Sequence, residues 1–144
     1  MRFHFQFESL LDIRRHRENK ERQKLGQLLE KQVSLEEKIT QLKQKIAKFE
    51  ETMLSGGSHK ALAVRQQYTQ KQELQKKSWQ IQREQEKLEK KIAQQRHRLR
   101  EANKQTRMLE KLKDRQRAEF VEEFQRQEQK QQNEVAIQMY NRSQ

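Results

Sequence analysis

The chain has 144 residues and carries 33 Lys and Arg against 21 Asp and Glu, a formal net charge of +12. Only 31% of its residues are hydrophobic, and it contains three Gly and neither Pro nor Cys. This composition excludes disulfides and thiolate chemistry, and it argues against a thick two-layer core. No stretch approaches the roughly 18 apolar residues that span a bilayer, and no signal peptide is recognisable, so we expect the protein to stay in the compartment where it is made.

The first half of the chain carries a heptad repeat between residues 25 and 53. Its apolar positions recur with alternating steps of three and four residues, which is typical of a coiled coil and argues against disorder. Extended backwards, the frame reaches Leu11 and Phe7, but polar residues between 14 and 21 are expected to weaken it. The a and d positions are Leu25, Leu28, Gln32, Leu35, Ile39, Leu42, Ile46, Phe49 and Met53.

Gly56 and Gly57 then interrupt the pattern. Because glycine adopts left-handed conformations at little cost, this pair predicts the turn of a hairpin. A second seam follows, more polar than the first, and its frame is predicted to slip near residue 112. Its positions are Leu74, Ser78, Ile81, Gln85, Leu88, Ile92, Gln95, Leu99, Ala102, Thr106 and Leu109.

Two helices joined by a short turn are antiparallel neighbours. The sequence therefore predicts an all-α fold, an antiparallel two-helix coiled-coil hairpin with arms of unequal length, as a single domain over residues 1–144. Folding about residue 57 places Leu25 opposite Leu88. The predicted elements are a helix over about 4–54, a turn at 55–59 and a helix over about 60–141.

The shorter first arm is predicted to cover the second only to about residue 110. The remaining overhang begins with an apolar cluster, Leu112, Phe120, Val121 and Phe124, which has no partner within the first arm. The cluster is expected to lie where the segment with Phe3, Phe5 and Phe7 arrives. A lone helix with an apolar stripe needs a partner, which could also be a second copy of the chain.

The basic excess lies almost wholly in residues 60–117, which hold 18 basic and 7 acidic side chains. Such a face could follow a phosphate backbone, an acidic protein groove or anionic lipid head groups, or could simply be solvated. Aromatic side chains that would stack on bases are missing from the run of Arg and Lys between 96 and 117.

The sequence contains no catalytic constellation. The four histidines are scattered, none belongs to a metal-binding motif, and a two-helix hairpin offers little concavity for a pocket. We therefore expect no enzymatic activity, no cofactor, no metal site and no small-molecule substrate.

Both ends of the chain carry more specific motifs. The N-terminus reads FHFQFESLLDIR, with Phe3, Phe5 and Phe7 ahead of a Leu-Leu pair, and LEKLKDRQRAEF spans residues 109–120. With the short Gly turn and the Gln/Glu-rich tail, the chain resembles the flagellar export protein FliJ family over its whole length.

That resemblance implies a non-enzymatic, cytoplasmic component of the bacterial flagellar type III protein export apparatus, peripheral at the cytoplasmic face of the cell membrane. It implies a role in flagellum biogenesis, and hence in chemotaxis, as a stalk similar to that of rotary ATPases. The implied partners are the hexameric export ATPase, the cytoplasmic domain of the membrane export gate, and export chaperones. The ATPase-ring contact would comprise Phe3, Phe5, Phe7, Leu112, Phe120, Val121 and Phe124, and the export-gate contact Leu42, Phe49, Tyr68 and Leu74.

Two other hypotheses remain open. The chain could be a basic coiled coil that binds nucleic acid or an anionic membrane, or a generic homodimeric spacer. The unequal arms and the Phe-rich N-terminus favour the export stalk, for which no nucleic-acid partner is expected.

Overall fold

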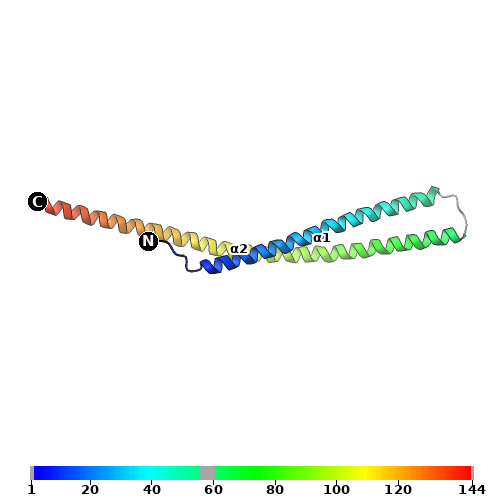
Figure 1. The fold of residues 1–144 in the computed structure, drawn as a ribbon, viewed down its shortest axis with the longest axis horizontal. Helices are drawn as coiled ribbons and strands as arrows, with labels where there is room; N and C mark the ends of the chain where they lie inside the picture. The colour runs from blue at the N-terminus through cyan, green and yellow to red at the C-terminus, as the bar shows by residue number, and fades with distance from the viewer. Residues whose placement is uncertain (1, 56–60, 144) are drawn as a thin grey trace. The chain divides into compact units, whose positions relative to one another are not determined.

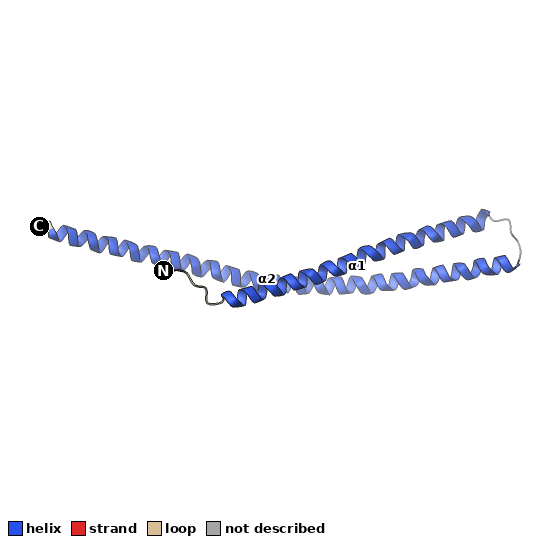
Figure 2. Cartoon of the chain, in the orientation of Figure 1, coloured by secondary structure: helices blue, strands red, loops and turns tan. Residues whose placement is uncertain are grey.

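The computed structural model describes residues 2–55 and 61–143, which form two long helices and no strand (Figures 1 and 2). Helix α1 spans Glu8–Ser55 and helix α2 spans Ala61–Arg142. They contain 48 and 82 residues and run antiparallel (Figure 1). The predicted fold class, an antiparallel hairpin with arms of unequal length, is confirmed.

The helix bounds differ from the prediction mainly at the first helix. Residues 4–7 precede α1, although they were predicted to be helical, and Ser55 is its last residue rather than part of the turn. The chain enters the helix through a turn at residues 6 and 7, where the backbone N–H of Glu8 donates to the Phe5 carbonyl at 3.2 Å. The predicted turn residues Gly56 and Gly57 lie outside the described residues.

The contacts divide the chain into two compact units. Unit 1 comprises residues 1–19 and 100–144, and unit 2 comprises residues 20–99. Each unit contains a segment of both helices, so each has its own stretch of seam. That residues 1–144 form a single domain stays a prediction.

In unit 2 the seam follows the predicted heptads except at Met53, which is exposed. Leu35, Leu42 and Ile92 are buried, and the intervening seam positions are half-buried. Gln95 is buried as well, and its side-chain amide donates hydrogen bonds to the backbone carbonyl of Glu21, at 3.0 Å, and to the Glu21 carboxylate. The polar side chain of Gln95 therefore has hydrogen-bond partners within the seam.

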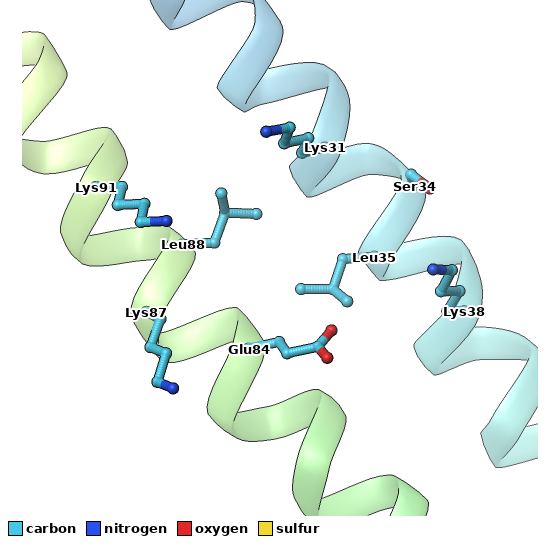
Figure 3. A pocket seen from close by; sticks show the side chains of 8 residues that line it. All are labelled: Lys31, Ser34, Leu35, Lys38, Glu84, Lys87, Leu88 and Lys91. Atoms are coloured by element: carbon cyan, nitrogen blue, oxygen red, sulfur yellow. The ribbon is translucent and has the colours of Figure 1, made fainter.

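The register within unit 2 differs from the prediction. Leu88 points toward Leu35 (Figure 3), not toward Leu25. Reversing the chain symmetrically about residue 57 would set Glu21 near Ile92, and a carboxylate against an apolar side chain is costly. The observed pairing of Glu21 with Gln95 avoids that cost, so polar complementarity contributes to the register.

Unit 1 has a shorter seam with one more polar layer. Phe5, Leu11 and Ala102 are buried. The Asn103 side chain donates a 2.8 Å hydrogen bond to the Glu18 carboxylate, which is also buried.

The predicted slip of the frame near residue 112 is wrong. The seam of α2 continues without a break from Leu109 through half-buried Lys113 and Gln116 to Phe120. The slip was predicted from the apolar cluster of Leu112, Phe120, Val121 and Phe124. Two polar residues, Lys113 and Gln116, occupy the seam positions there. Both side chains are long enough to lie along the seam while their polar ends reach solvent or a partner.

Candidate functional site

The N-terminal segment of unit 1 lies against α2. The ring of Phe3 lies 5.7 Å from the ring of Phe120, centroid to centroid, with the planes inclined at 50°. Phe5 is 3% exposed, and its ring makes an edge-to-face contact with Phe7 at 5.9 Å and 78°. Lys113 lies over the Phe5 ring, with Nζ 6.0 Å from the centroid. We call the four rings of Phe3, Phe5, Phe7 and Phe120 the aromatic clamp.

An ion pair fixes the same junction. Lys113 Nζ lies 2.8 Å from one carboxylate oxygen of Glu8 and 3.1 Å from the other. Glu8 is the first residue of α1, where a carboxylate also interacts favourably with the helix dipole. One lysine therefore contacts both the start of α1 and the aromatic clamp.

The structure brings together most of the residues predicted to contact the ATPase ring, but it exposes only some of them. Phe3, Phe5 and Phe120 pack within unit 1, and Leu112 is half-buried. Phe7, Val121 and Phe124 are exposed, by 37%, 47% and 39%. The contact of Phe3 with Phe120 agrees with the prediction that the N-terminal Phe segment lies beside the cluster of the overhang.

Beyond Phe120, α2 continues uncovered. Every residue from Val121 to Ser143 is exposed. The overhang therefore begins about ten residues later than the sequence predicted, because the extended N-terminal segment lengthens the covering arm. Its end is capped by Ser143, whose backbone amide and hydroxyl donate to the Tyr140 carbonyl at 3.2 and 2.8 Å. The exposed apolar side chains of the overhang are Val121, Phe124, Val135, Ile137, Met139 and Tyr140.

The residues predicted to contact the export gate lie in unit 2 and are unequally accessible. Leu42 is buried in the seam, and Phe49 and Leu74 are half-buried. Tyr68 is 62% exposed. Only Tyr68 can offer most of its side chain to a partner without the helices separating, and the gate contact itself stays a prediction.

Comparison with known families identifies the chain. The family model described as Flagellar FliJ protein matches residues 3–144. The chain belongs to the flagellar FliJ protein family. No curated protein and no solved structure matches it.

Membership of the FliJ family makes the chain a component of the flagellar export apparatus and associates it with flagellum biogenesis. The match includes both the aromatic clamp and the uncovered end of α2. Within the described residues, no helix is long and apolar enough to cross a membrane, and no group of three or more His, Asp or Glu side chains could hold a metal ion.

One feature of this FliJ-family chain was missed from the sequence. The pair of Glu8 with Lys113 carries no local signal, because the residues are far apart in sequence and only the register brings them together.

Proposed function

We propose that this chain is a non-enzymatic coiled-coil stalk of the flagellar type III export apparatus. Its joined termini insert into the central pore of the hexameric export ATPase, and the half nearer the turn contacts the cytoplasmic domain of the export gate. The stalk also escorts export chaperones, and it acts in the cytoplasm and at the cytoplasmic face of the cell membrane.

The observation that carries the ring contact is the uncovered stretch of α2. Residues 121–142 form the end of α2 with every side chain exposed, and Phe124 and Val121 lie in the first turns of this stretch. A single helix is about 10–12 Å wide with its side chains, which is narrow enough to enter a ring of subunits. The aromatic clamp holds the N-terminus beside the base of this helix, so both termini reach the ring together.

Deleting residues 121–144 tests the ring contact. The deletion removes only exposed side chains among the described residues and keeps Phe120, so the hairpin should melt as the intact chain does. It should abolish stimulation of the purified ATPase ring and impair motility in cells. A matched control replaces Gln127, Gln131 and Gln132 with Ala, which leaves the apolar side chains in place.

The paired substitutions Val121→Ala and Phe124→Ala should weaken stimulation less than the deletion does. If the chain without residues 121–144 stimulates the ring as well as the intact chain, the working end lies elsewhere. The basic face between residues 96 and 117 would then be the next candidate.

The gate contact is tested separately at Tyr68. Replacing this exposed side chain with Ala should reduce binding of the purified cytoplasmic domain of the gate without lowering the melting temperature. The control is Gln72→Ala, one turn further along the same helix and exposed. Equal binding of both variants would remove Tyr68 from the contact.

A further inference from the structure

A groove of about 350 Å³ lies between α1 and α2 in unit 2. Its floor is apolar: Leu35 is buried, Leu88 is half-buried, and the two side chains point toward one another (Figure 3). All of its other lining residues are exposed. They are Lys31, Ser34, Lys38, Glu84, Lys87 and Lys91.

Three of these lysines, Lys31, Lys38 and Lys91, belong to two columns of charge on one flank of the seam. On α1 a lysine precedes each of the first four a positions, Leu25, Gln32, Ile39 and Ile46, at residues 24, 31, 38 and 45. On α2 the matching positions hold Lys77, Glu84, Lys91 and Arg98. The flanking positions of a coiled coil usually pair opposite charges, and like charges that face each other are destabilising.

Unit 1 shows the usual arrangement. There the flanking residue Arg15 lies 3.4 Å from Glu110, and the seam residue Lys113 lies 2.8 Å from Glu8, so that both pairs link the two helices. In the part of the chain that the structure describes, none of the four groove lysines forms an ion pair with a carboxylate. With four lysines against one carboxylate, that of Glu84, the groove keeps an excess of positive charge that is available to an anionic ligand.

We propose that this groove docks an acidic amphipathic helix of a partner protein, which adds a third helix to unit 2. Apolar side chains of the docked helix would lie on Leu35 and Leu88, and its carboxylates would meet the lysines on both rims. Lys31 and Lys38 are about two helical turns apart, roughly 10 Å. The partner therefore needs carboxylates that recur every seven residues beside its apolar stripe.

The apolar floor favours such a helix over a nucleic acid. A phosphate backbone would pair with the lysines but would leave the two leucines facing a polar, hydrated chain. An amphipathic helix satisfies both the charge and the apolar surface, as in other complexes where a helix lies in a groove. The inference does not depend on the ring contact, which involves unit 1.

The test uses the full chain and a labelled synthetic peptide of about three heptads, with Leu at the apolar positions and Glu on both flanks. A second peptide carries Gln in place of each Glu. The groove variant replaces Lys31, Lys38, Lys87 and Lys91 with Gln. The matched control variant makes the same change in charge at four exposed lysines that do not line the groove, Lys20, Lys48, Lys76 and Lys90.

Fluorescence anisotropy at low ionic strength should show that the groove variant binds the Glu peptide at least about tenfold more weakly than the parent chain. The control variant should stay within about twofold, and the Gln peptide should bind weakly to all chains. Deleting residues 121–144 should leave peptide binding unchanged, so the stalk proposal and this one fail separately.

Three outcomes would overturn the inference. Equal losses in the groove and control variants would show diffuse attraction by net charge. Failure of the Glu peptide to bind, or equal binding of the Gln peptide, would remove the acidic helix as the occupant. Binding of a DNA duplex or of phosphatidylglycerol vesicles through the same four lysines, without peptide binding, would identify a phosphate site instead.

Discussion

Two consecutive stretches of α2 have similarly polar sequences but opposite burial. In residues 100–120, Thr106 is buried and even Lys113 is half-buried, because the N-terminal segment and the start of α1 lie against them. In residues 121–143 every side chain is exposed, including Phe124. Burial along this helix is therefore decided by the presence of a partner segment and not by the apolar content of the stretch.

The difference has an energetic consequence. The covered stretch shares its stability with α1, so its helix is held by tertiary packing. The uncovered stretch has only its own helix propensity, which is high because Gln, Glu, Arg and Lys dominate it. A stretch of that kind can keep its shape while leaving its apolar side chains available to another molecule.

The largest predicted loss of stability is at Leu11, in the part of α1 that covers α2. Leu11 is fully buried in unit 1. Replacing it with Ala should lower the free energy of unfolding by about 2–5 kcal/mol, since a buried leucine loses both its transfer energy and its contacts. Thermal melts followed by circular dichroism, with urea titrations for the free energy, would measure the change.

The matched control is Ile137→Ala in the overhang, a side chain that is 59% exposed. Its effect should stay within about 0.5 kcal/mol, as for other surface substitutions. Comparable losses for the two variants would show that the overhang is buried against something in solution, for example a second copy of the chain.

Hydrogen exchange tests the same comparison without a mutation. Amides in residues 100–120 open only when the two helices separate, whereas those in residues 121–143 open by fraying of one helix. We expect protection factors at least about 100-fold higher in the covered stretch, a difference of roughly 2.7 kcal/mol in opening free energy. Equal protection across Phe120 would contradict the boundary between covered and uncovered helix.

A smaller effect, the coupling energy between Phe3 and Phe120, tests where the covered part of α2 ends. Phe3 and Phe120 should couple by about 0.5–1.5 kcal/mol in a double-mutant cycle of Phe3→Ala and Phe120→Ala, because their rings are in contact. Pairing Phe3→Ala with Phe124→Ala is the control, and that cycle should show no coupling. If the control cycle couples as strongly, the N-terminal segment reaches further along α2 than Phe120.

The sequence predicted the hairpin and most of the seam, because a heptad pattern depends only on local spacing. Residues such as Leu35, Leu42 and Ile92 are buried as predicted. The seam beyond Leu109 was missed because Lys113 occupies a seam position, and composition alone cannot show that its stem packs while its amine is paired.

The register and the candidate site were harder to predict, because both depend on pairing between distant residues. The position of the turn predicted that Leu25 lies opposite Leu88. In the structure Gln95 pairs with Glu21 and Leu88 lies near Leu35, so the register is shifted. For the site, the sequence identified the Phe residues of both ends as a group. It could not tell that Phe5 is buried while Phe7 remains exposed, since both belong to one alternating motif.

The smallest predicted effect concerns the ion pair at the start of the covered stretch. Lys113 and Glu8 are partly exposed, with side chains 27% and 42% accessible. A double-mutant cycle of Lys113→Ala and Glu8→Ala should therefore give a coupling of about 0.2–1 kcal/mol, smaller at high salt because the pair is screened. Lys111, two residues away and exposed, supplies the control cycle with Glu8 and should show no coupling. If Lys113→Ala destabilises the chain while the cycle shows no coupling with Glu8, Lys113 acts mainly through its contact with the Phe5 ring, and the aromatic clamp rather than the ion pair holds the N-terminal segment on α2.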